Sequence, residues 1–163
     1  AIERRDGPSC LLLTRQGLPV QPRDAAQLDA IARGAYVLLE PDTTPTAVII
    51  ATGSEVKLAV STAQALNALG SAIRVVSMPS VDVFEQQEAD YKQAILPDQL
   101  RHRIAIEAGS RDGWFKYVGL DGCVIGLDDF GASAPAADLY EHFELTNEHV
   151  QRRVARYLKL QAD

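Results

Sequence analysis

The sequence predicts a three-layer α/β/α domain built around a five-stranded, mostly parallel sheet. Apolar runs of strand length recur along the chain, and stretches with the apolar spacing of helices separate them, an alternation typical of parallel α/β sheets. The length of 163 residues and the hydrophobic fraction of 47% are sufficient for one core of this kind. The five runs are Tyr36–Leu39, Ala47–Ala51, Ile73–Ser77, Ile104–Ala108 and Cys123–Leu127.

A segment of different character precedes these runs. Its apolar residues Cys10–Leu13 predict a short buried strand, which polar residues and turn formers follow. A helix is then expected from Asp24, a candidate N-cap, to Arg33. Gly34 comes next and is a residue type that commonly ends helices.

Among the helices between the strands, the one after the second strand of the domain has the clearest pattern. Ser54 is a candidate N-cap, apolar residues recur at helical spacing, and Gly70 supplies a stop. Pro79 and Pro97 bound the stretch Val81–Leu96, which predicts one or two short helices. Further helices are expected at Trp114–Val118, Pro135–Phe143 and Asn147–Leu160, the last with Thr146 as its N-cap.

Charge and cysteine content narrow the class of protein. A formal net charge of -6 argues against nucleic acid or an anionic membrane as the main partner, because both require clustered positive charge. No apolar run approaches the roughly 20 residues that span a bilayer. Cys10 and Cys123 lie in apolar runs, as expected of free thiols in a reducing compartment, so a cytoplasmic protein is predicted. The chain begins at Ala1 without an initiator methionine, so upstream sequence is to be considered.

Some residues at predicted strand ends are candidate sites, each with a simpler structural interpretation. Thr52–Glu55 joins a strand to a helix start, where backbone N–H groups can hold an anion, but capping by Ser54 explains these residues without a ligand. Glu107 and Asp128–Asp129 follow strands and can stand at the carboxyl edge, where α/β sheets bind ligands. Loop carboxylates are more often solvated or capping, so no catalytic residue is predicted.

The histidines and aromatic residues favour structural roles. His102, His142 and His149 lack neighbouring Cys or Glu in a ligand motif, so no metal site is predicted. The aromatic run Trp114–Tyr117 is either an interface anchor or part of the core. Phe130–Pro135 contains small residues typical of a tight turn into a helix.

Segments along the whole chain together resemble transketolase. They occur in the family's order, and six ordered matches across the predicted elements make coincidence implausible. The segments are Asp6–Pro8 with Leu11–Pro19, Ile31–Leu38, Ile50–Val56, Arg74–Ser80, Trp114–Gly119 and Phe130–Pro135.

The resemblance implies a division of the chain. Residues 1–33 are similar to the tail of the pyrimidine-binding domain, including its last strand. Residues 34–163 are similar to the family's carboxy-terminal domain, whose first strand runs antiparallel to the others.

The resemblance also implies an activity. Transketolases are homodimers that transfer a two-carbon ketol unit from a ketose phosphate to an aldose phosphate in the pentose phosphate pathway, using thiamine diphosphate and Mg or Ca. The family's motifs for the diphosphate, the metal and the reacting groups belong to parts that are absent here. The chain by itself is therefore expected to be inactive and to bind neither cofactor nor metal.

One functional residue carries over from the family. The arginine of the Ser-Arg-Gln motif contacts the sugar phosphate, and the motif occurs here in the variant form Thr14–Gln16. Threonine keeps the hydroxyl, and a guanidinium offers a planar fork of donors to phosphate oxygens. The resemblance thus implies that Arg15 binds the substrate phosphate.

Two other functions stay open on the sequence. One is an independent regulatory domain that binds a small ligand at the carboxyl edge of its sheet. The other is the same domain in another thiamine-diphosphate enzyme, such as deoxyxylulose-phosphate synthase. The run Thr14–Pro19 favours transketolase over the second alternative.

Overall fold

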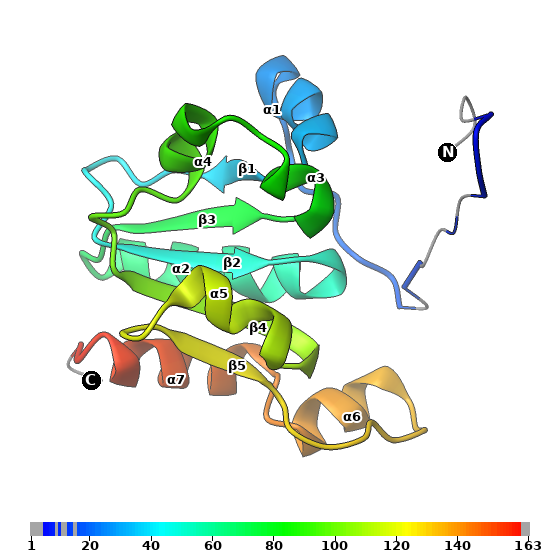
Figure 1. Cartoon of the computed structure of the whole chain (residues 1–163). Coiled ribbons are helices and arrows are strands. Elements are labelled where there is room, and N and C mark those ends of the chain that lie inside the picture. Colours follow the sequence, from blue (N-terminus) through cyan, green and yellow to red (C-terminus); the bar gives the residue numbers. More distant parts are fainter. Residues whose placement is uncertain (1–4, 9, 11–12, 15, 161–163) are drawn as a thin grey trace.

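A five-stranded sheet in the order β1-β3-β2-β4-β5 forms the centre of the computed structural model, which describes residues 5–8, 10, 13–14 and 16–160 (Figure 1). β1 pairs antiparallel with β3, and the other neighbouring strands are parallel. The predicted sheet and its antiparallel first strand are confirmed. The strands are β1 (Tyr36–Leu39), β2 (Ala47–Ala51), β3 (Ile73–Ser77), β4 (His102–Ser110) and β5 (Cys123–Leu127).

The strand β4 is longer at both ends than its apolar run Ile104–Ala108 predicts. His102 pairs with Ala47 of β2, and Ser110 pairs with Leu127 of β5. The end residues His102 and Ser110 are exposed, whereas the middle of the strand is buried. The apolar run therefore predicts the buried middle of this strand and not its exposed ends.

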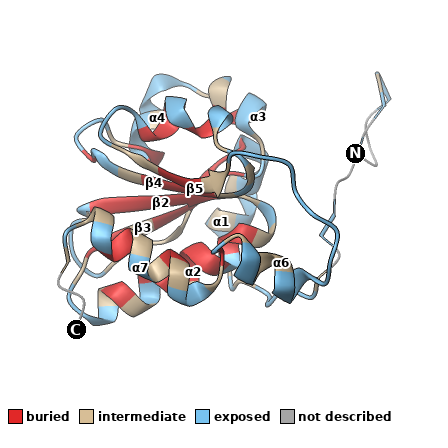
Figure 2. Cartoon of the chain, turned by 90° about the horizontal axis from the view of Figure 1, so that it is seen from below, coloured by how far each residue is buried: buried red, intermediate tan, exposed pale blue. Residues whose placement is uncertain are grey.

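Helices cover both faces of the sheet (Figure 2). Strand residues alternate between two cores, so that Ile49 packs with α2 and α7, whereas Val48 and Ile50 pack with α3, α4 and α5. None of the helices in the described part of the chain is long and apolar enough to cross a bilayer. The helices are α1 (Ala25–Ala30), α2 (Val56–Ala68), α3 (Val81–Glu85), α4 (Ala89–Ile95), α5 (Phe115–Val118), α6 (Ala136–His142) and α7 (Asn147–Tyr157), with short 3-10 turns η1 (Ile31–Arg33), η2 (Gly53–Glu55) and η3 (Asp112–Trp114).

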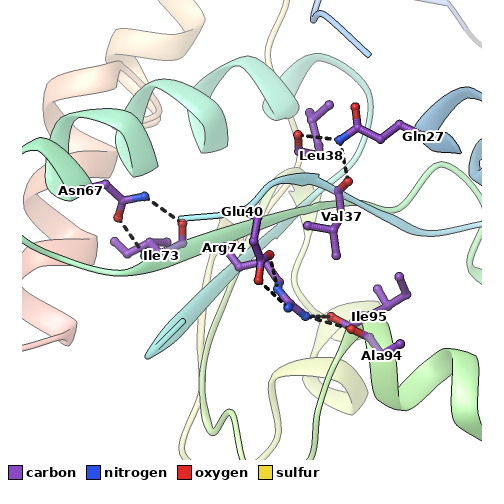
Figure 3. Close-up of polar contacts among 9 residues, drawn as sticks. All are labelled: Gln27, Val37, Leu38, Glu40, Asn67, Ile73, Arg74, Ala94 and Ile95. Atoms are coloured by element: carbon purple, nitrogen blue, oxygen red, sulfur yellow. Dashed lines mark hydrogen bonds and ion pairs between the residues drawn. The ribbon is translucent and has the colours of Figure 1, made fainter. Parts of the chain in front are cut away.

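The helix α1 is fastened to the edge strand β1 by one side chain (Figure 3). Nε2 of Gln27 donates to the carbonyl oxygens of Val37 and Leu38, at 3.0 Å each. Its Oε1 accepts from the backbone N–H of Asp24 at 3.1 Å, while the Asp24 carboxylate accepts from the N–H of Gln27 at 2.7 Å. Asp24 thus caps α1 as predicted, in a capping box.

Gly34 and Thr146 also end and begin helices as the sequence predicts. Gly34 has a φ of 87°, and a Cβ there would lie 2.4 Å from the carbonyl oxygen of Ser80, so a side chain cannot be accommodated. Thr146 caps α7 with its hydroxyl. The amide of Asn67 bridges to the backbone of Ile73, which joins the last turn of α2 to the start of β3 (Figure 3).

Two predictions of local structure are wrong. Ser54 does not cap α2: the turn η2 precedes the helix, and the Ser54 hydroxyl donates to the carboxylate of Glu55 instead. Cys10 and Leu13 are exposed and belong to no strand, because no strand of the described sheet lies beside them to pair with. The rest of that predicted strand, residues 11–12, lies outside the described residues.

Candidate functional site

The candidate site lies at the carboxyl edge of the sheet. The parallel strands end there, and the start of α2, the helix α6 and the segment before α1 lie at the same end of the molecule (Figure 1). The strand order places β2 between β3 and β4. After β2 the chain continues into α2 on one face of the sheet, whereas after β3 it continues into α3 and α4 on the other face, so the direction of the crossover connections reverses here. Open α/β sheets bind ligands at such a reversal.

A buried carboxylate anchors this edge. Glu55 is only 5% exposed, and its Oε1 accepts hydrogen bonds of 2.6 Å from both Tyr140 Oη and Ser54 Oγ. The two hydroxyls are 3.1 Å apart. Burial, together with the bond to Glu55, raises the pKa of Tyr140 to about 12, so the phenol keeps its proton at neutral pH. This negative charge at the start of α2 disfavours an anion there, so the Thr52–Glu55 turn has a structural role.

The segment before α1 reaches the same cluster. Nε2 of Gln16 donates to Tyr140 Oη at 3.3 Å, and the Thr14 hydroxyl donates to Oε1 of Gln16. Arg15, the predicted phosphate ligand between these two residues, lies outside the described residues.

An open hollow of about 470 Å³ lies beside this cluster, and Gln16, Ser54, Lys57 and Tyr140 contribute to its lining. A second open hollow of about 760 Å³ adjoins Gln16, Ser54 and Tyr140 and is also lined by the small residues of the loop before α6. The carboxyl edge is therefore hollowed where the segment before α1 crosses it.

The other carboxylates at this edge each have their own partner. Glu107 on β4 accepts a 3.1 Å hydrogen bond from Trp114 Nε1, and burial raises its pKa. The Asp128 carboxylate pairs with Arg111 and is exposed. Asp129 accepts from the backbone N–H of Phe130 at 2.7 Å. These partners support the structural interpretation of all three carboxylates.

The histidines occupy separate environments. His102 packs edge-on against Tyr157 with ring centroids 5.9 Å apart, and Nδ1 of His149 lies 2.9 Å from the Thr146 hydroxyl. Within residues 5–8, 10, 13–14 and 16–160, no group of three or more His, Cys, Asp or Glu side chains could hold a metal ion. Trp114 and Tyr117 are 6% and 5% exposed, which favours the core interpretation of the aromatic run.

Sequence reasoning missed Glu55 and Tyr140 as partners. They are 85 residues apart, and neither belongs to a recognisable catalytic or ligand-binding sequence motif. The nearest signal in the sequence was Glu55, an acidic residue directly before α2. Because Ser54 was interpreted as the helix cap, Glu55 was given no role of its own.

Comparison with known proteins identifies the family. The model of the transketolase-like TK C-terminal domain matches residues 34–146. Transketolase 2 of Vibrio vulnificus (strain CMCP6) is 54% identical over 150 residues, which are 92% of this chain and 23% of that protein. Transketolase 1 of Vibrio cholerae is 50% identical over 158 residues, or 97% of this chain and 24% of that protein. The chain thus spans about a quarter of the length of these relatives.

Solved structures agree with this. Transketolase from Leishmania mexicana superposes with a TM-score of 0.72 at 39% identity, over 81% of this chain and 19% of that one. Transketolase from Pichia stipitis in complex with sedoheptulose 7-phosphate gives a TM-score of 0.72 at 35% identity, with the same coverage of 81% and 19%. The chain belongs to the transketolase family and contains its C-terminal domain.

Proposed function

We propose that this chain is part of a transketolase that transfers a two-carbon ketol unit from a ketose phosphate to an aldose phosphate in the pentose phosphate pathway. The observation that carries the proposal is the 54% identity to a transketolase over 150 residues. A relative of the same fold has been solved with sedoheptulose 7-phosphate, a substrate of the proposed class. The enzyme is proposed to be a cytoplasmic homodimer.

Thiamine diphosphate and Mg or Ca are proposed as the cofactors of the whole enzyme, and they do not fit the described residues of this chain. The helix start at the carboxyl edge carries the buried carboxylate of Glu55, which repels a diphosphate. The described residues also offer no cluster of three or more metal-ligating side chains. We therefore assign the cofactors to other domains, and this chain to structure and substrate binding.

The proposed boundary lies between residues 33 and 34. Residues 1–33 belong to the tail of the pyrimidine-binding domain, and residues 34–163 form the C-terminal domain. Gly34 supports the position of the boundary, because its positive φ turns the chain from η1 into β1.

Arg15 is proposed to bind the substrate phosphate. Its contact lies away from the reacting carbons and is therefore similar in the ground state and the transition state. Uniform binding of this kind lowers KM and leaves kcat largely unchanged. A hydrogen bond to a charged group contributes about 1.5–3 kcal/mol, so Arg15→Ala should lower kcat/KM for phosphorylated sugars about ten- to a hundredfold.

Steady-state kinetics of the full-length enzyme test this role. Arg15→Lys should restore only part of the loss, since an ammonium keeps the charge but not the planar fork. Substrates without a phosphate are the internal control. Equal losses for both substrate classes in Arg15→Ala would show that the residue is structural. Calorimetry with thiamine diphosphate and magnesium should detect no binding to this chain alone, and micromolar binding would contradict the assignment of the cofactors to other domains.

A further inference from the structure

The outward side of α1 and η1 is apolar. Between Ala25 and Ala32 the only charged residue in the sequence is Asp29. Leu28 and Ile31 are 56% and 39% exposed, and their spacing of three residues makes them neighbours on the helix surface. Surface helices normally direct charged and polar side chains toward solvent. A helix with a continuous apolar outer side is therefore a candidate contact surface for another protein domain.

The helix α7 of the same chain shows the ordinary pattern. It exposes Glu148, Arg152 and Arg156 to solvent, and its apolar residues Val150 and Val154 are buried in the core. α1 also lies at the surface, beside the edge strand β1 (Figure 1). Its lack of charge is therefore a property of this one surface and not of the whole molecule.

Polar contacts fix α1 and η1 on the α/β domain, so their apolar side cannot turn inward. Before α1, Nε of Arg23 donates to Tyr36 Oη at 2.7 Å. The side-chain bonds to β1 hold the middle of the helix. After it, Nε of Arg33 donates to Oε1 of Gln87 at 3.0 Å, and the guanidinium lies 3.3 Å from the ring centre of Tyr91. The apolar side is thus presented in one orientation before a partner binds.

An open hollow of about 480 Å³ extends this apolar side. Ile31 lines it together with Leu18 and Val20 of the segment before α1 and with Val56 of α2. Val20 is 90% exposed. The exposed apolar residues of this region, which we call the α1 surface, are Leu18, Val20, Leu28 and Ile31.

The length of the relatives indicates what covers the α1 surface. The chain corresponds to 23% of transketolase 2 of Vibrio vulnificus, and the family model that it matches describes a C-terminal domain. On the proposed function, about three quarters of the enzyme is joined to this chain in one polypeptide. A joined domain meets the surface at a roughly millimolar effective concentration, which favours it over a second copy of the chain.

We propose that the α1 surface is the docking site of the preceding domain of the same polypeptide. The inference rests on the proposed function. Residues 21–33, assigned above to the tail of the pyrimidine-binding domain, are then held between the two domains, with polar contacts on one side and apolar contacts on the other. The patch that meets them is apolar, because the α1 surface offers it no charge to pair with. The C-terminal domain is thereby held in a fixed position relative to its neighbour.

Labelling of an introduced cysteine with a maleimide measures whether the surface is covered. Leu28→Cys should react about tenfold or more slowly in the full-length enzyme than in the 163-residue chain, since the docked domain has to move away first. Leu69→Cys is the matched control: it is 77% exposed at the end of α2 that lies away from the carboxyl edge, and should react equally in both proteins. Peptide mapping separates these sites from Cys10 and Cys123. Equal rates for Leu28→Cys in the two proteins would overturn the inference.

A charged variant tests the energetic role of the contact. Leu28→Asp should leave the urea midpoint of the 163-residue chain unchanged, because the side chain is exposed there. In the full-length enzyme it should speed amide exchange at residues 25–33 about tenfold. A lower midpoint in the 163-residue chain would show that Leu28 is already packed within it, and unchanged exchange in the full-length enzyme would show that nothing docks there. Either result contradicts the proposal.

Two further measurements separate the alternatives. Light scattering should show the 163-residue chain as a monomer, and a dimer that Leu28→Asp dissociates would assign the surface to a second copy and overturn the proposal. Ketol transfer by the unmutated full-length enzyme tests the proposed function separately. Absence of that activity would overturn the function, whereas rapid labelling of Leu28→Cys in an active enzyme would overturn the docking inference alone.

Discussion

Arg74 on β3 and Glu40, the residue after β1, form a two-pronged ion pair in which Nε–Oε2 and Nη2–Oε1 are both 2.7 Å (Figure 3). Nη1 of the same guanidinium donates to the carbonyl oxygens of Ala94 and Ile95, at 2.9 and 3.1 Å. The Arg74 side chain is 12% exposed and that of Glu40 is 45% exposed. One arginine therefore ties the edge strand, its neighbour and the end of α4 together.

The two partners of this ion pair should differ in their contribution to stability. Arg74→Met leaves two carbonyls and a carboxylate without a donor, and should lower the free energy of unfolding by about 2–3 kcal/mol. Glu40→Gln removes a half-exposed charge and should cost about 0.5–1 kcal/mol. Urea unfolding measures both. Equal losses would mean that the carbonyl contacts contribute little.

Gln27 should contribute more to the free energy of unfolding than a typical exposed helix residue does. Gln27→Ala removes the side-chain half of the capping box and both bonds to β1, so the free energy of unfolding should fall by about 1–2 kcal/mol. Gln64→Ala on the exposed face of α2 is the matched control and should change it by less than about 0.5 kcal/mol. Faster amide exchange in α1 of Gln27→Ala should accompany the loss, and equal effects of the two substitutions would refute this role.

Thr62 is expected to be replaceable with a gain in stability. It is 1% exposed on α2, and among the described residues its Oγ1 has no hydrogen-bond partner. Thr62→Val replaces the unpartnered hydroxyl by a methyl group of similar shape and should raise the free energy of unfolding by about 1 kcal/mol. Thr62→Ser keeps the hydroxyl, loses a methyl group and should lower it. A loss in both variants would indicate that the hydroxyl has a partner.

Glu107 should make stability depend on pH. Burial, with a smaller contribution from the Glu55 charge, raises its pKa above the ordinary value of 4.5, although the bond from Trp114 acts in the opposite direction. The folded state then binds more protons than the unfolded state between these two pKa values, so this group lowers the free energy of unfolding as the pH rises through that window.

Glu107→Gln removes this titration and keeps an acceptor for Trp114. The variant should be more stable than the parent chain at pH 7, and its advantage should shrink as the pH falls toward 4. Urea unfolding at a series of pH values measures the difference, with Glu141→Gln on the exposed face of α6 as the control. A constant difference across this range would rule out the proposed titration.

The strands and most helices of this protein follow from local patterns in its sequence. Runs such as Ala47–Ala51 are apolar throughout because both faces of the sheet are covered, and caps such as Asp24 and Thr146 act within three residues of themselves. These signals are local, so they can be read without a structure. The antiparallel direction of β1 came from the family resemblance, because no local pattern specifies which way an edge strand runs.

The polar contacts at the carboxyl edge, by contrast, arise from the packing of elements that are distant in the sequence. The Ser54 hydroxyl bonds to Glu55 and not to the backbone of α2, and Tyr140 of α6 bonds to the same carboxylate. Gln16, from the segment before α1, bonds to Tyr140. Hydrogen bonds require particular atoms within about 3 Å. Which atoms meet at that distance is determined by how the helices and the preceding segment pack on the sheet, and residue spacing along the chain does not encode that packing.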